Sequence, residues 1–92
     1  MSDAHKAARI FKVLSIDNRL RIIEILKQDS LCVNAISKAI NITPAAVSQH
    51  LRVLRDADVV IADTQGYFMH YQINKETLKE WNLVAQKILY TN

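Results

Sequence analysis

One stretch of the chain carries basic residues and no acidic ones. Between Ser30 and Arg55 the sequence contains Lys38 and Arg52 but no aspartate or glutamate. A surface that faces phosphate groups should lack carboxylates, so this stretch predicts contact with nucleic acid. The formal net charge of +3 over 92 residues is compatible with such a partner, but it does not establish one because many proteins are equally basic.

The segment that follows Pro44 has the spacing of a helix with one apolar and one polar side. Val47, Leu51 and Leu54 recur at i, i+4 and i+7, so we expect them to face the interior. The opposite side presents small, polar and basic residues, which suit the major groove of DNA. The predicted DNA contacts are Thr43, Ala45, Ala46, Ser48, Gln49, His50, Arg52 and Arg55 of this segment, with Gln65 and Tyr67 of the following turn.

These residue types predict different roles within that surface. Ser48 and Gln49 can hydrogen-bond to base edges, and glutamine suits adenine. Arg52, Arg55 and the Thr43 cap are expected to contact phosphates, assisted by the N-terminus of the helix. The same helices could instead be only the core of a helical bundle. The Thr-Pro start, the acid-free stretch and the hairpin that follows favour DNA binding.

Four helices, a hairpin and a last helix are expected to position these residues. Apolar residues recur at helical spacing up to Ala57, and the period then changes to two, with Gly66 at the turn. The expected ranges are helices at about 3–14, 17–27, 33–40 and 44–57, strands at 59–64 and 67–73, and a helix at about 75–90. The expected caps are Ser2 or Asp3, Asp17, Thr43 and Asn74. The fold class predicted is mainly α with a small β-hairpin (α+β), a winged helix-turn-helix of order ααααββα in one domain, 1–92.

Some packing details follow from the same spacing. In the second helix Leu20, Ile23 and Leu26 are expected on the buried side. In the third, the apolar side is expected to comprise Ala35, Ile36, Ala39 and Ile40. Asn41 tolerates the left-handed conformation that helix ends need.

The last helix has a wider apolar face than one small domain can cover. Its aromatic and aliphatic residues could belong to the core of the chain or to a dimer interface, and the small size of the domain favours the interface. The first and last helices, about 3–14 and 75–90, are therefore expected to form a homodimer. The residues predicted at this interface are Phe11, Leu78, Trp81, Ala85, Ile88 and Leu89.

The chain resembles a known family of regulators in three segments. They are Leu20-Arg21-Ile22-Ile23-Glu24-Ile25-Leu26, Leu31-Cys32-Val33, and the thirteen residues from Thr43 to Arg55 with their Val-Ser-Gln-His-Leu core. These segments are similar to the ArsR/SmtB family of bacterial and archaeal repressors, and the similarity runs from about Ala7 to Ile88. The resemblance implies a dimer formed by the first and last helices, release of DNA when an effector binds, and control of a nearby operon.

The chain departs from that family at its metal sites and its wing. The arsenic-type site of the family resembles Cys-Val-Cys, and here the third residue is Asn34. One thiolate cannot supply the three soft ligands that such a site needs. The zinc site of the last helix needs histidines, and here the stretches read Asn74-Lys75-Glu76 and Gln86-Lys87-Ile88-Leu89. Tyr67 occupies the place where the family usually has arginine in the wing. We expect no recognisable metal site or cofactor, and weaker anchoring by the wing.

Cys32 is the only cysteine, so the chain can form no intrachain disulfide and no cysteine-rich zinc module. The first interpretation is a small buried apolar residue, and the alternative is a thiol sensor, which would need an exposed thiolate. His5 and His70 have no partner at metal-ligand spacing, although a site shared across a dimer is an alternative. The effector is unknown.

The remaining observations limit the function class. The sequence has no paired carboxylates and no Gly-rich phosphate loop, and Ser48 and His50 point to different sides of a helix, so an enzyme is not indicated. No apolar run is long enough to span a membrane and the first residues lack a signal peptide, so a cytoplasmic protein is expected. The sequence predicts a homodimeric repressor that binds palindromic operator duplexes and is released by an effector or by thiol modification. The alternative is a winged-helix adaptor with little specific DNA binding, for which Tyr67 is the main support.

Overall fold

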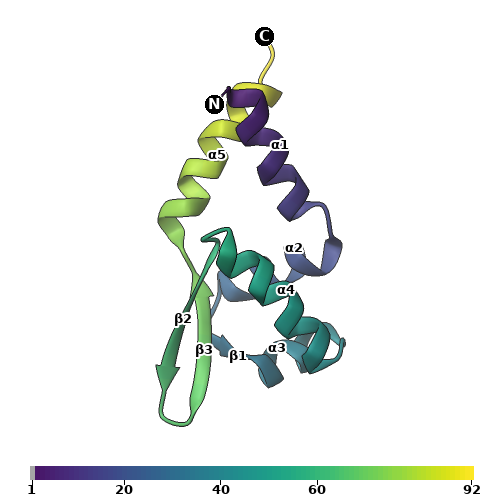
Figure 1. Cartoon of the computed structure of the whole chain (residues 1–92), viewed down its shortest axis with the longest axis vertical. Helices are drawn as coiled ribbons and strands as arrows, with labels where there is room; N and C mark the ends of the chain where they lie inside the picture. The colour runs from purple at the N-terminus through teal and green to yellow at the C-terminus, as the bar shows by residue number, and fades with distance from the viewer. Residues whose placement is uncertain (1) are drawn as a thin grey trace.

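The computed structural model describes residues 2–92, apart from the side chain of Gln65. The elements in chain order are α1 (Asp3–Leu14), α2 (Asp17–Leu26), β1 (Leu31–Cys32), α3 (Val33–Ile40), α4 (Pro44–Asp56), β2 (Val60–Gln65), β3 (Phe68–Ile73) and α5 (Lys75–Leu89). The predicted fold class and order of helices and hairpin are confirmed, with β1 as an added strand. α1 and α5 pack side by side as an arm that carries both chain ends, and the other elements form a body below it (Figure 1).

A side-chain cap fixes the start of α1 but not the starts of α2 and α5. The Ser2 hydroxyl accepts a hydrogen bond from the His5 amide at 3.1 Å, which caps α1 as expected. The prediction that Asp17 caps α2 is wrong, because Ile16 holds the cap position and Asp17 is the first helical residue. There its carboxylate is still favourable, since the first turn is the positive end of the helix dipole. Asn74 holds the cap position of α5 without a side-chain hydrogen bond.

The turn between α3 and α4 is held by its own residues. Asn41 ends α3 in the left-handed conformation, with φ 57° and ψ 49°. The Ser37 hydroxyl donates to the carbonyl of Ile42, and the Ile42 amide donates to the Ser37 carbonyl at 3.3 Å. Thr43 then starts α4, its hydroxyl accepting from the Ala46 amide at 3.1 Å. These bonds satisfy the helix ends and fix the angle at which α4 leaves α3.

The hairpin is part of a three-stranded antiparallel sheet of order β1-β3-β2. β1 pairs Leu31 with Tyr71 and Cys32 with His70, and β2 pairs Asp63 with the same His70. Gly66 makes the hairpin turn at φ 65°, a conformation that residues with a side chain rarely adopt. Sequence periodicity did not predict β1, because two residues are too few to show an alternation.

The core lies between α2, α3, α4 and the base of the sheet. Its largest fully buried side chains are Ile22, Ile36, Val47, Leu51, Leu54 and Val59. Burying one such side chain contributes about 1.5–3 kcal/mol, so this cluster dominates the stability of the body. The α4 stripe is confirmed. The expectation for α2 was wrong in part, because Leu20 is 43% exposed and Ile22 is buried in its place; on α3, Ala39 is exposed.

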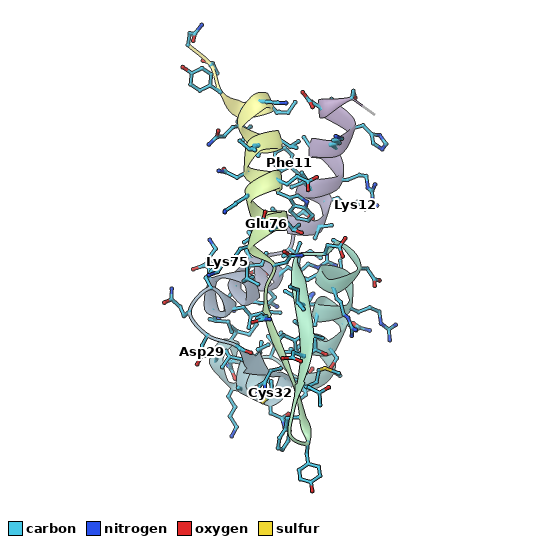
Figure 2. All side chains as sticks on the ribbon, turned by 90° about the vertical axis from the view of Figure 1, so that its left-hand side faces the viewer. Phe11, Lys12, Asp29, Cys32, Lys75 and Glu76 are labelled. Carbon is cyan, nitrogen blue, oxygen red and sulfur yellow. The ribbon has the colours of Figure 1, made fainter. Side chains whose placement is uncertain are left out.

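The arm is held together mainly by small and aliphatic residues of α1. Ala7 and Ile10 are buried, whereas no described residue of α5 is fully buried. Phe11 lies on the arm, above the body that holds Cys32 (Figure 2). Within the described part of the chain, no helix combines the length and apolarity needed to cross a membrane.

Candidate nucleic-acid interface

One side of α4 is free of the core and carries most of the predicted DNA contacts. The residues of this side that are exposed are Thr43, Ala45, Ser48, Gln49, Arg52 and Arg55, and Ala46 is half-buried. Residues 45, 49 and 52 share one side because positions three and four apart are neighbours on a helix. Small residues at the start of α4 leave its backbone accessible, and the unpaired N–H groups of a first helical turn attract anions. The chemistry available is therefore hydrogen bonding to bases and ion pairing with phosphates.

A groove lies between α4 and Tyr71 of β3. Its volume is about 600 Å³, and it is lined by Ser48, Leu51, Arg52, Arg55, Asp56 and Tyr71. Tyr71 was not among the predicted site residues, because strand alternation alone places its side chain on a face without saying which helix covers that face. The phenol adds a hydrogen-bonding group beside the two guanidinium groups. Asp56, which follows the acid-free stretch, adds one carboxylate to the lining.

His50 lies apart from the exposed arc of α4. It is half-buried and faces the start of α2, where Arg19 and Asp17 are its charged neighbours. Burial lowers the pKa of His50 below its usual 6.5, the Arg19 guanidinium lowers it further, and the Asp17 carboxylate partly opposes them. The side chain of Arg19 is also directed inward, donating to the Val13 carbonyl at 3.2 Å. Among the predicted contacts, His50 is therefore the one placed next to the protein body.

The wing ends in apolar side chains. Tyr67 is fully exposed, Phe68 is 60% exposed and Met69 is also exposed. The Gln65 side chain, predicted as a contact, lies outside the part of the chain that the structure describes. The hairpin extends away from the arm, to the end of the molecule opposite both termini (Figure 1).

Cys32 is half-buried at the cap position of α3, rather than fully buried as its first interpretation had it. The sheet register places it directly across from His70, with Asp63 on the other side of the same histidine. The Nδ1 atom of His70 is buried and has no hydrogen-bond partner among the described residues. Among those residues, no three His, Cys, Asp or Glu side chains gather closely enough to hold a metal ion.

The predicted interface residues divide into two groups. Leu78 and Trp81 are half-buried against the core of their own chain, and Ala85 is half-buried in α5. Phe11, Ile88 and Leu89 are exposed, as is Leu83, which the sequence analysis did not single out. The arm therefore presents several large apolar side chains to its surroundings.

Two helices joined by a left-handed turn, with a hairpin directly after the second, define a winged helix-turn-helix domain. In this class the second helix, here α4, has the dimensions to enter the major groove. The chain belongs to the ArsR family of bacterial regulatory proteins, whose family model matches residues 17–62. It is accordingly a transcriptional regulator and not an enzyme.

Individual relatives cover most of the chain. The transcriptional repressor SdpR of Bacillus subtilis is 30% identical over 71 residues, which are 77% of this chain and 79% of that protein. The cadmium resistance transcriptional regulatory protein CadC homolog of Staphylococcus aureus is 31% identical over 90% of this chain and 68% of its own. Among solved structures, the homodimeric winged helix-turn-helix DNA-binding domain of a possible ArsR-family regulator from Mycobacterium bovis superimposes with a TM-score of 0.74. It is 27% identical and covers 95% of this chain and 84% of that domain.

Proposed function

We propose that this regulator is a homodimeric repressor that binds palindromic operator DNA through α4. The observation that carries the proposal is the exposed side of α4, where small and polar residues at the helix start are followed by Arg52 and Arg55 beside the wing. The relative from Bacillus subtilis is named a transcriptional repressor, which supports repression rather than activation. Because its proposed partner is DNA, we propose that the protein acts in the cytoplasm.

Within the complex, the two parts of this side of α4 have separate roles. Ser48 and Gln49 lie in the first half of α4 and contact base edges in the major groove. Arg52 lies one turn further along and Arg55 about two turns. Both pair with phosphates, assisted by the N-terminus of the helix, which Thr43 caps. His50 acts through the packing of α4 on α2. The exposed wing tip, which carries Tyr67, contributes apolar contact with the DNA backbone in place of an ion pair.

The dimer interface of this proposal is the arm. Phe11, Ile88 and Leu89 expose apolar surface that a second copy would cover. A two-fold axis through this arm presents two copies of α4 to successive turns of one face of the duplex. The solved Mycobacterium bovis domain is described as homodimeric, which supports this assembly.

Fluorescence anisotropy of a labelled duplex from the gene's own upstream region tests the function. The protein should bind this duplex more tightly than a shuffled one, and the logarithm of the binding constant should fall steeply and linearly with the logarithm of salt concentration. Equal affinity for both duplexes would remove the claim of specific repression.

A second candidate function is a winged-helix adaptor for other proteins. The observation that favours it is the wing tip, where Tyr67 and Phe68 are exposed in place of a basic residue. An adaptor would show no salt-dependent DNA binding but a stable complex with a protein partner.

We infer that the protein holds no resident metal or cofactor. For regulation, we propose that modification of the Cys32 thiol releases the protein from DNA. Its half-buried thiol at the start of α3 lies beside His70, so an added group there would disturb the contact between β1 and β3. Polysulfide or peroxide should release wild-type protein from DNA but leave a Cys32→Ser variant bound. Retention of both proteins would show that the thiol is structural.

A further inference from the structure

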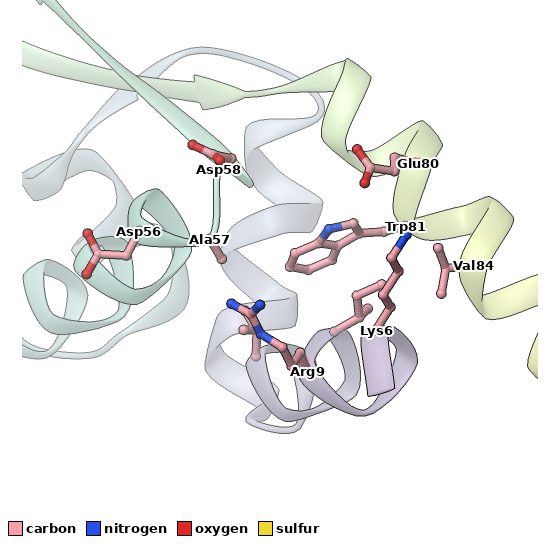
Figure 3. Close-up of a pocket in the computed structure, with 10 residues that line it drawn as sticks. Lys6, Arg9, Asp56, Ala57, Asp58, Glu80, Trp81 and Val84 are labelled. Carbon is pink, nitrogen blue, oxygen red and sulfur yellow. The ribbon is translucent and has the colours of Figure 1, made fainter. Parts of the chain in front are cut away.

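A pocket of about 290 Å³ lies where the arm meets the end of α4. It is lined by Lys6, Arg9, Ile10 and Val13 of α1, by Asp56, Ala57 and Asp58 after α4, and by Glu80, Trp81 and Val84 of α5. Figure 3 shows the Trp81 indole in the middle, with Asp58 and Glu80 on one side, the Arg9 guanidinium toward Ala57, and the Lys6 ammonium group near Val84. The pocket shares Asp56 with the groove beside α4 and does not include Cys32.

The charged groups around the pocket are not paired with one another. Within the described part of the chain, the only ion pair joins Lys79 to Glu76, and both of these residues lie outside the pocket. The side chains of Arg9 and Glu80 are exposed, and Ile10 and Val13 add apolar surface to the lining. The pocket therefore offers separated positive and negative groups with an apolar floor between them.

We propose that this pocket binds a small zwitterion with an apolar body, of the type of an aromatic amino acid. Its carboxylate would pair with Arg9, because a guanidinium group suits a carboxylate geometrically. Its ammonium group would lie near Asp58 and Glu80, and its ring would pack on Trp81. A cation alone or an anion alone would use only one of the two charged sides.

The pocket lies between the arm and the segment that connects α4 to β2. Asp58 has a left-handed backbone at φ 62°, between the end of α4 and β2, and the Val59 amide donates to the Leu54 carbonyl at 2.8 Å. A ligand that joins this segment to α1 and α5 would change how α4 is held relative to the arm. On α1, Phe11 of the proposed dimer interface points well away from Lys6 and Val13, so the interface leaves this part of the pocket open.

Trp81 is the only tryptophan of the chain, so its fluorescence reports directly on the pocket. Full-length protein would be titrated with L-phenylalanine, with 3-phenylpropionate, which lacks the ammonium group, and with phenethylamine, which lacks the carboxylate. We expect a saturable change with L-phenylalanine and about tenfold weaker binding of each analogue, roughly one charged hydrogen bond's worth of affinity. No saturable change at millimolar L-phenylalanine, or equal binding of all three probes, would overturn the proposal.

Two variants test which side chain binds the carboxylate of the ligand and which binds its ammonium group. Arg9→Gln should weaken L-phenylalanine about tenfold but leave phenethylamine unchanged, and Glu80→Gln should weaken L-phenylalanine but leave 3-phenylpropionate unchanged. Lys79→Gln, next to the pocket on α5, is the matched control and should change nothing. Binding that is insensitive to both pocket variants would contradict the assignment.

The effect on DNA is a separate readout that rests on the proposed function. Saturating L-phenylalanine should shift the midpoint of the DNA titration for wild type but not for Arg9→Gln. A fluorescence response without such a shift would contradict regulation through α4 and leave the binding site standing. If the protein binds no specific DNA at all, the Trp81 titration still tests the pocket.

Discussion

Arg52 and Gln49 are three residues apart on the exposed side of α4, and we expect them to contribute differently to DNA binding. Arg52→Gln should weaken binding to all duplexes and lower the slope of the salt dependence by about 1, because it removes one phosphate contact. Gln49→Ala should instead cost about 1–3 kcal/mol at one base position and leave the salt slope unchanged. Anisotropy titrations over a salt series, on operator and shuffled duplexes, measure both effects.

Lys27→Gln is the control for these variants, because Lys27 is an exposed cation at the end of α2, away from α4. It should lower the net charge by one and leave both the affinity and the salt slope near wild type. An equal loss in Lys27→Gln and Arg52→Gln would mean that net charge, rather than the position of Arg52, governs binding.

His50 connects the pH dependence of stability to the packing of α4 on α2. Burial and Arg19 lower its pKa in the folded protein, so the unfolded chain takes up a proton more readily. The stability from neutral His50 is fully present above about pH 6.5, its unfolded value, and is lost as pH falls toward the lowered pKa. His50→Gln should therefore make the fall in the free energy of unfolding from about pH 7 to about pH 5 shallower.

Urea unfolding of both proteins at fixed concentration over this pH range measures the difference. His5 and His70 are present in both proteins, so their contributions cancel in the comparison. Parallel pH profiles would show that His50 does not report on the α2–α4 contact.

For single residues, the sequence predicted exposure on a helix better than it predicted which other elements a side chain contacts. Arg52 and Arg55 were correctly expected on the exposed side of α4, since the buried stripe of that helix is unambiguous. His50 and Tyr71 show what periodicity leaves out. One is turned toward α2 and the other joins the groove beside α4, and both placements depend on how separate elements pack.

Among the elements, α4 depends most visibly on one side chain. Thr43→Ala removes the hydroxyl that accepts from the Ala46 amide, and it should cost about 1 kcal/mol of stability. DNA affinity should also fall, because the first turn of α4 frays. Thr43→Ser keeps the hydroxyl and should retain most of both properties. Thermal unfolding and anisotropy measure the pair, and equal behaviour of the two variants would contradict a capping role.

The sequence predicted most elements because their signals are local. Asn41 and Pro44 punctuate α3 and α4, and Gly66 marks the hairpin. What it did not predict came from tertiary contacts. β1 exists only because β3 lies beside it, and Leu20 is exposed because α2 turns Ile22 to the core instead.

For the whole molecule, assembly through the arm has a direct test. Phe11→Glu places a charge in the proposed interface and should weaken the dimer by more than about tenfold, or about 1.4 kcal/mol. Leu20→Glu is the matched control, because Leu20 is similarly exposed but lies on α2. Sedimentation equilibrium should show monomer for Phe11→Glu and dimer for the control, with unchanged far-UV circular dichroism for both. Dimerisation of Phe11→Glu at wild-type strength would place the interface elsewhere.

A dimer that reads DNA through two copies of α4 depends on the spacing of the two half-sites. Anisotropy titrations would compare the palindrome from the upstream region with the same sequence carrying about 5 extra base pairs at its centre, half a helical turn. A dimer with two copies of α4 on one face of the duplex should lose most of its specific affinity on the longer site, because the second half-site has rotated to the far side. Equal affinity for both spacings would contradict a two-fold repressor that reads DNA through α4.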